Sequence, residues 1–361
     1  MNKVVTLIPF DEIESSALDQ LKYIDSLDFV TSISVMPDIH SGYTMPIGTV
    51  ALMDNVISPE CVGYDIGCGM CHVVTDIKAG LIMKDREDIF KEIYSGIPVG
   101  FNSRPKGIEY GSFSHYNKEL KEKVDNKLNV QLGTLGSGNH FIELGRNKDG
   151  YLTVTVHSGS RNIGHSIASY YIKLSKTEDT KLPKGFLFLN SKNGQDYLKD
   201  MNFSLEYALE NRKIMLKEVM DILGLEFNND YINENHNHAI VQEDGMVLHR
   251  KGATPADKGQ YGVIPGNMRD GVYVTIGLGN EKYLSSASHG AGRKFSRKKA
   301  KETIDINDFK ESMKGIVAKV DNGTLDESPD AYKNLDYVIG LQKGIVVDII
   351  DKTEPIINIK G

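Results

Sequence analysis

The stretch YLTVTVHSG, residues 151–159, alternates polar and apolar side chains and then opens into serine and glycine. Such alternation is typical of a β-strand with one buried face, and the glycine marks the start of a turn. A helical pattern follows at about 163–177. Outward from this unit the sequence predicts a hairpin at 239–250 that turns at Asp244-Gly245, strands at 3–8, 47–53 and 71–77, and helices at 11–27, 84–95, 116–126, 197–223 and within 293–302. Strands and helices therefore alternate without an internal repeat.

The composition is that of a globular protein. Of 361 residues, 40% are hydrophobic and 25% are charged. No apolar run is long enough to span a bilayer and no leader pattern follows Met1, so we expect a cytoplasmic protein without a membrane partner. The net charge of −7 means that any nucleic acid would have to bind a local basic surface.

The three cysteines lie close together, at Cys61, Cys68 and Cys71. A secreted disulfide framework would instead spread an even number of cysteines along the chain. The sequence therefore predicts reduced thiols.

Most histidines lie in loops rich in glycine, serine and asparagine. A single histidine on an apolar helix face is most often a core residue with its hydrogen bonds satisfied. Eight at strand ends and glycine turns fit that interpretation poorly, because loops on a rigid scaffold are where binding residues gather. The eight are His40, His140, His157, His165, His236, His238, His249 and His289.

A carboxylate and a thiol lie three residues apart in GYDIGC, at Asp65 and Cys68. On a glycine-bearing turn they can point at one spot, and imidazoles from distant loops would complete a divalent metal site. The alternative is a buried cysteine beside an aspartate that stabilises a turn. A structural zinc site made by Cys61, Cys68, Cys71 and His72 is disfavoured, since no second pair of ligands follows.

Nine motifs carry a family resemblance. In order they are MPDIHSGYTMPIGTV, VGYDIGCGM, LGTLGSGNHFIEL, VHSGSRNIGH, NHNHA, HRKGATPA, VIPGNM, SASHGAGR and AYKNLD. The series runs from about residue 36 to the NIKG segment at 358–361 and resembles the RtcB family of RNA-splicing ligases. Each motif alone is modestly informative, whereas nine in order are highly specific.

The resemblance implies an enzyme that uses GTP and two manganese ions. It would join an RNA 3′-phosphate, or a 2′,3′-cyclic phosphate that it first opens, to a 5′-hydroxyl. His289 in SASHGAGR matches the histidine that is guanylylated, and a neutral imidazole is a usable nucleophile near pH 7. From the residues alone, His289 is equally well interpreted as an anion-binding histidine at a helix start.

The same comparison implies the residues of the metal and nucleotide sites. The implied metal ligands are Asp65, Cys68, His140, His157 and His236, with Cys68 bridging two ions. Manganese is implied by the resemblance alone, because a thiolate ligand favours softer ions such as zinc. The implied guanosine contacts are Asn139, His140, Phe141, Ile142, Glu143, His236, Asn237, Pro265, Gly266, Asn267, Met268, His289, Gly290, Ala291, Gly292, Tyr332 and Lys360. Glu143 is suited to accept hydrogen bonds from the guanine N1–H and amino group.

Basic residues near these motifs are candidates for binding RNA. Arg161 and Arg293 are favoured because each lies inside a glycine-rich motif, and contacts of this kind position a phosphate without reading sequence. The others, Arg250, Lys251, Arg297, Lys298 and Lys299, also fit a solvated basic surface. An archease-like activator is a further partner that the resemblance suggests.

The chain departs from the family pattern after Met268. It continues as Arg269-Asp270-Gly271-Val272, with Val272 where a guanine-binding serine is expected, and Pro255 replaces a common basic residue. Two other functions stay open: a metal-dependent phosphoesterase acting on RNA ends or nucleotides, which would not need His289, and a noncatalytic metal-binding protein that interacts with RNA.

The expected fold is α+β. We predict a single RtcB-like domain over residues 1–361, in which packed β-sheets flanked by helices gather distant loops around a central metal cleft.

Overall fold

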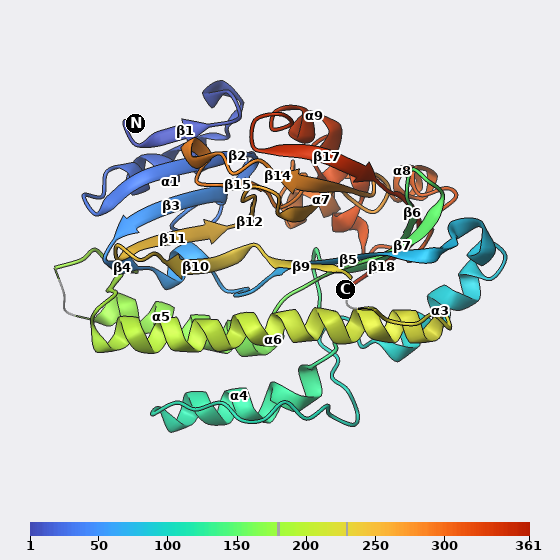
Figure 1. Ribbon diagram of the computed structural model, residues 1–361, viewed down its shortest axis with the longest axis horizontal. Helices are drawn as coiled ribbons and strands as arrows, with labels where there is room; N and C mark the ends of the chain where they lie inside the picture. Colours follow the sequence, from blue (N-terminus) through green and yellow to red (C-terminus); the bar gives the residue numbers. More distant parts are fainter. Residues whose placement is uncertain (179–180, 229) are drawn as a thin grey trace.

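A six-stranded sheet lies at the centre of the protein. The computed structural model describes residues 1–178, 181–228 and 230–361 (Figure 1). The strand order in the sheet is β16-β18-β6-β7-β5-β9, and every neighbouring pair from β18 to β9 is antiparallel. The strands are β16 (Val317–Ala318), β18 (Glu354–Lys360), β6 (Phe141–Arg146), β7 (Tyr151–Ser158), β5 (Gly69–Lys78) and β9 (Ile232–Asn235).

A second, five-stranded sheet carries the N-terminal part of the chain. Its order is β1-β2-β3-β11-β10. The strands are β1 (Val4–Thr6), β2 (Val30–His40), β3 (Ile47–Asp54), β11 (Met246–Lys251) and β10 (Asn237–Val241). The chain passes between the two sheets at His236, where β9 ends and β10 begins.

Three smaller sheets complete the β-structure. Met70 and Phe141 of the central sheet pack on Val263 and Val272, which belong to the β13-β14-β17 sheet. The two sheets therefore share a small apolar core. The remaining strands are β13 (Tyr261–Pro265), β14 (Val272–Gly277), β17 (Val347–Lys352), β12 (Ala253–Pro255) with β15 (Ser286–Ser288), and β4 (Val56–Ile57) with β8 (Leu187–Phe188).

Helices flank the sheets. Figure 1 shows α5 (Arg161–Thr177) and α6 (Lys192–Ile222) running along one side, with α4 (Lys118–Gln131) beyond them. Buried residues of α6, including Met215 and Val219, pack on the central sheet, while α4, α5 and α6 share another apolar cluster. The other α-helices are α1 (Ser15–Asp25), α2 (Pro59–Val62), α3 (Arg86–Gly96), α7 (Arg297–Thr303), α8 (Ile306–Ser312) and α9 (Leu335–Gly340).

The elements predicted from sequence periodicity form, with shifted ends. The hairpin turns at Asp244-Gly245, where the Asp244 carboxylate accepts the Met246 N–H and Gly245 has a φ of 84°. The helix expected within 293–302 begins only at Arg297, because Ser296 caps it and the preceding residues belong to a loop. The helix predicted from residue 11 begins at Ser15, after a short 3₁₀ turn at Phe10–Glu12.

The α+β class and the sheets flanked by helices are confirmed. The assignment of residues 1–361 to one domain stays a prediction. Limited proteolysis that gave two stable halves, one with Asp65 and the other with His289, would contradict it. Among the described residues, none of the helices has the length and apolar character needed to cross a membrane.

Candidate functional site

Five predicted metal ligands meet where four neighbouring strands of the central sheet begin or end. Because β6, β7, β5 and β9 are successive antiparallel neighbours, the starts of β6 and β5 lie beside the ends of β7 and β9. His140 directly precedes β6, and Cys68 directly precedes β5. His157 is the next-to-last residue of β7, and His236 directly follows β9. We call these four residues and Asp65 the strand-end cluster.

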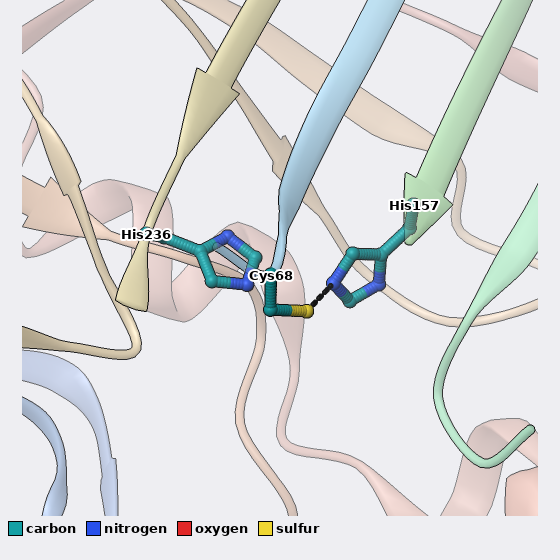
Figure 2. Close-up of side chains that lie close together, drawn as sticks. All are labelled: Cys68, His157 and His236. Atoms are coloured by element: carbon teal, nitrogen blue, oxygen red, sulfur yellow. Dashed lines mark hydrogen bonds between the residues drawn. The ribbon is translucent and has the colours of Figure 1, made fainter. Parts of the chain in front are cut away.

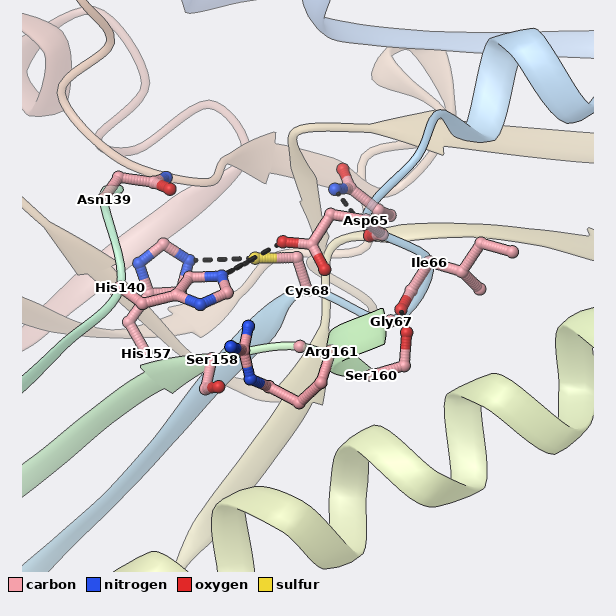
Figure 3. A network of polar contacts seen from close by, with 12 residues as sticks. Asp65, Ile66, Gly67, Cys68, Asn139, His140, His157, Ser158, Ser160 and Arg161 are labelled. Carbon is pink, nitrogen blue, oxygen red and sulfur yellow. Dashed lines mark hydrogen bonds and ion pairs between the residues drawn. The ribbon is translucent and has the colours of Figure 1, made fainter. Parts of the chain in front are cut away.

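The donor atoms of this cluster lie close enough to one another to be candidate ligands of metal ions. Cys68 Sγ lies 3.2 Å from His157 Nε2 and 3.4 Å from His140 Nε2, and the first contact is drawn in Figure 2. Asp65 Oδ2 lies 3.0 Å from His140 Nε2 (Figure 3). Cys68 belongs to two groups whose donor atoms lie within 4.8 Å of one another, one with His157 and His236 and one with Asp65 and His140.

The backbone around Cys68 is held on three sides. Its N–H donates to Asp65 O at 3.1 Å, and its carbonyl accepts the His236 N–H at 2.7 Å. The intervening Gly67 has a φ of 74°, and a Cβ there would come within 2.8 Å of the Ala208 side chain on α6. Arg212, fully buried on α6, donates to Gly67 O at 2.8 Å and to Ser158 O at 2.9 Å. The turn therefore requires glycine and is fixed before any ligand binds.

The protonation states suit a cation. Burial lowers the pKa of His157 and of His236, so both imidazoles are neutral and can offer a lone pair. Burial alone would raise the pKa of Asp65, but His140, Arg161 and Cys68 together outweigh it, so the net pKa is lowered. Burial, together with Asp65, raises the pKa of the Cys68 thiol, so its proton would leave only when a cation takes its place.

Two observations test whether these residues fit a metal. His140 Nδ1 lies 3.0 Å from Leu135 O and so donates to it, which leaves Nε2 as the ligand atom. Within the described part of the chain, the buried Nδ1 of His236 has no hydrogen-bond partner. A sulfur, three imidazoles and a carboxylate fit a divalent transition-metal ion, and Cys68 is placed to serve two.

The predicted nucleophile is oriented by a buried aspartate. His289 follows β15, and its Nδ1 lies 2.6 Å from Asp38 Oδ2. The same oxygen accepts the N–H groups of His289 at 3.1 Å and Gly290 at 3.3 Å. Burial opposes ionisation of Asp38, but His289, His40 and Lys333 together outweigh it and lower the pKa. With Nδ1 donating to Asp38, the lone pair lies on Nε2 of a ring whose centroid is 5.0 Å from that of His236.

A cleft of about 1130 Å³ joins His289 to the strand-end cluster. Most of the predicted nucleotide and metal residues line it: Asp65, Cys68, Asn139, Phe141, His157, His236, Asn237, Pro265, Gly266, Asn267, Met268, His289, Gly290, Ala291, Gly292, Tyr332 and Lys360. Four other predicted site residues lie behind its wall, namely His140, Ile142, Glu143 and Arg161.

Alternation along β6 explains two of these. Ile142 points into the apolar core on the opposite face of the sheet, so its side chain is directed away from the cleft. Glu143 shares its face with Phe141 and lies beneath Asn358, whose Nδ2 donates to Glu143 Oε2 at 3.0 Å. Burial raises the pKa of Glu143 to about 8, so the carboxyl carries a proton at neutral pH.

Buried charges hold the other end of the cleft. Glu327 forms ion pairs with Lys360 Nζ at 3.0 Å, with Arg293 Nη1 at 3.2 Å and with Arg297, and it accepts a hydrogen bond from the Tyr332 hydroxyl. Burial would raise the pKa of Glu327, but Lys360 and Arg297 outweigh it and lower it to about 2. We call these five residues the Glu327 cluster. It fixes Tyr332 and Lys360 on the cleft wall.

The residues that depart from the family pattern lie differently. Val272 is fully buried against Met70 and Phe141, and its N–H donates to Thr353 Oγ1 at 3.1 Å. Its side chain is therefore a core residue. Arg269 pairs with Asp270 at 2.8 Å and is half-exposed at the turn.

The two favoured RNA-binding arginines are already engaged. Arg161 donates to Thr134 Oγ1 at 3.2 Å and to Gly100 O at 3.1 Å, and its φ of 60° lies in the left-handed region. Strain of this kind persists where surrounding contacts enforce it, often at functional sites. Arg293 lines the cleft, yet its guanidinium contacts Glu327, Tyr332 and two backbone carbonyls. RNA binding by either residue stays a prediction.

Sequence reasoning missed several residues that build the site. Asp38 had a signal, since it lies two residues before His40 in the MPDIHSGY motif. Arg212 and Glu327 had none, because an arginine within a helical pattern and a glutamate in a loop usually face solvent.

Comparison with known proteins identifies the family. A family model described as tRNA-splicing ligase RtcB matches residues 20–114 and 106–361. The chain belongs to the RtcB family. Among its relatives, the RNA-splicing ligase RtcB of Escherichia coli K12 is 31% identical over 388 residues, which cover 97% of this chain and 95% of that protein. The tRNA-splicing ligase RtcB of Aeropyrum pernix is 31% identical over 423 residues, covering 91% of this chain and 87% of the relative. The RtcB resemblance inferred from the motifs is thus confirmed.

Proposed function

We propose that this RtcB-family protein is a GTP- and manganese-dependent RNA ligase that joins a 3′-phosphate or 2′,3′-cyclic phosphate end to a 5′-hydroxyl end. The observation that carries the proposal is the 2.6 Å contact between His289 Nδ1 and Asp38 Oδ2. It fixes the tautomer that leaves Nε2 nucleophilic, on a ring that lines the same cleft as the strand-end cluster.

The proposed chemistry divides one difficult step into several. His289 Nε2 forms a bond to the α-phosphorus of GTP as the bond to pyrophosphate breaks, and Asp38 stabilises the developing positive charge on the imidazole. The guanylyl group then passes from His289 to the RNA 3′-phosphate. Finally the 5′-hydroxyl attacks that phosphate and GMP leaves. Two divalent cations held by the strand-end cluster would neutralise the triphosphate and polarise the reacting oxygens.

The other end of the cleft suits the guanosine. Asn267, Tyr332 and Lys360 line it. Glu327 holds Tyr332 by accepting a hydrogen bond from its hydroxyl and holds Lys360 by an ion pair. Glu143 lies just behind Asn358 and would read the guanine edge after a small shift of that amide. Because these groups are already held in place, they would lose little conformational entropy when guanosine binds, which favours affinity.

His289→Ala tests the proposal. The variant should form no covalent GMP adduct with labelled GTP and should not join 3′-phosphate ends, while still binding manganese. RNA supplied with an already guanylylated 3′ end should be joined, because only the last step remains. A variant that still takes up label from GTP would place the nucleophile elsewhere.

A metal-dependent phosphoesterase is the second candidate. The strand-end cluster alone would be sufficient for it, since cations and a water can hydrolyse a phosphate ester. The two functions differ in their use of His289. Release of phosphate from RNA ends by the His289→Ala protein at the wild-type rate, without ligation by either protein, would favour the phosphoesterase.

A further inference from the structure

Three aromatic side chains that line the cleft contact one another. The Tyr43 ring meets the Tyr64 ring edge to face, with centroids 5.6 Å apart at an interplanar angle of 74°. Tyr64 in turn stacks on His165, with centroids 5.2 Å apart at 26°. All three line the cleft that contains His289. We call them the aromatic rim.

Tyr43 is exposed although its backbone is firmly held. Its side chain is 72% exposed. Gln20 on α1 donates to the carbonyls of Gly42 at 2.8 Å and Tyr43 at 2.6 Å, and it accepts the Gly42 N–H at 3.1 Å. The Ser41 N–H donates to Glu14. A large ring presented to water from a fixed loop contributes little to the core, which points to a binding role.

The rim lies beside the candidate reaction centre. Tyr64 directly precedes Asp65, so their Cα atoms are about 3.8 Å apart. His165 lies one turn along α5 from Arg161. Lys251 Nζ lies 5.9 Å from the centre of the Tyr43 ring. Aromatic faces thus lie next to a lysine that lines the same cleft, and aromatic faces combined with positive charge are typical of sites for single-stranded nucleic acid.

We propose that the aromatic rim stacks against a base of the RNA substrate, within about two nucleotides of the end being joined. The inference rests on the proposed ligase function and adds to it a subsite for RNA. Stacking would hold either strand without regard to sequence, since every base has a π-face. Lys251, which lines the same cleft, would attract an adjoining phosphate.

Substitution of Tyr43 is the direct test, because an exposed side chain can be removed without emptying the core. Tyr43→Ala should raise both the KM for RNA and the Kd measured by fluorescence anisotropy roughly 5- to 100-fold, the range for loss of one stacked base. Its kcat and the rate of GMP-adduct formation should match the wild type. Tyr43→Phe should behave like the wild type, since stacking needs the ring and not the hydroxyl.

The matched control is Tyr261→Ala. Tyr261 is 51% exposed but lies outside this cleft, so its removal should leave RNA affinity unchanged. Equal RNA affinity for Tyr43→Ala and the wild type would overturn the proposal. A Tyr43→Ala protein that forms the GMP adduct more slowly would also overturn it, because the rim would then serve GTP.

Abasic RNA gives a second test on the unaltered protein. Removing the base at each of the two positions nearest the end, one strand at a time, should weaken wild-type binding at one position and add nothing to the loss in Tyr43→Ala. Additive losses at every position would refute the proposal. A wild-type protein that binds RNA but never joins it would refute the ligase function alone, since the binding comparison does not depend on catalysis.

Discussion

The side chains of the strand-end cluster lie in or near the ends of strands that are hydrogen-bonded to one another. Those of the Glu327 cluster come from loops, a 3₁₀ turn, the start of α7 and the last residue of β18, and ion pairs join them. In the first case the register of the sheet sets the distances between the side chains. In the second case charge sets them, because the buried Lys360 is desolvated and needs its carboxylate. The same cleft is therefore held by backbone geometry at one end and by electrostatics at the other.

The largest expected effect is at the strand-end cluster. Cys68→Ala removes the ligand shared by both groups of donors. Loss of a residue that merely hydrogen-bonds to a metal ligand already costs up to about a hundredfold. Bound manganese and ligation should therefore each fall by more than about a hundredfold. Metal content after dialysis and ligation of 3′-phosphate RNA would measure it. The fold should survive, because the sheet register does not depend on this thiol.

Cys71→Ala is the matched control for that variant. Cys71 is equally buried but lies on the core face of β5, so metal content and ligation should be close to wild type. Unchanged metal content in Cys68→Ala would contradict the assignment of the strand-end cluster.

An intermediate effect is expected at the Glu327 cluster. Glu327→Gln leaves Lys360 buried without its carboxylate, which should lower the free energy of unfolding by about 3 kcal/mol. It should also raise the KM for GTP while manganese binding is preserved. Urea denaturation and adduct formation at varied GTP would measure the two effects.

Glu354→Gln provides the comparison on a surface pair. Glu354 pairs with Arg146, and both side chains are more than half exposed, so this change should cost at most about 1 kcal/mol. Equal costs for the two variants would show that buried charge does not hold the loop end of the cleft.

The smallest expected effect is the release of a proton from Glu143 when GTP binds. The pKa of Glu143 is raised to about 8, so the free protein holds a proton there at pH 7. If the carboxylate accepts hydrogen bonds from guanine, GTP binding must release that proton, and affinity should rise with pH until about 8 and then level off. Calorimetry of GTP binding in two buffers of different ionisation enthalpy would detect the release. Glu143→Gln should abolish this proton release. If the variant released as many protons on GTP binding as the wild type, Glu143 would not be a guanine contact.

The sequence predicted one end of the cleft better than the other, for a physical reason. Residues at strand ends beside glycine leave local signals, and the alternation of β7 with its terminal His157 could be seen directly. The Glu327 cluster depends on separate segments of the chain brought together by tertiary contacts. Neither Glu327 nor the buried Arg212 differs locally from a solvated residue. Resemblance identified Tyr332 and Lys360, but it could not show what holds them.

Two further outcomes had purely tertiary causes. The direction of Ile142 follows from which face of β6 meets the core, and periodicity does not say which face that is. Val272 lies in a small core between two sheets, a position that depends on how β14 packs on β5 and β6.

The place of β18 in the central sheet bears on how the protein is made. β18 pairs with β6 although more than two hundred residues separate them in the chain. A nascent polypeptide that has left the ribosome as far as β11 already carries Asp65, Cys68, His140, His157 and His236, but neither His289 nor Glu327. If the strand-end cluster holds cations as proposed, they can bind during translation, whereas the outer edge of β6 stays unpaired until the last strand has been synthesised. Manganese would then bind to the growing chain, whereas GTP would bind only to the finished one.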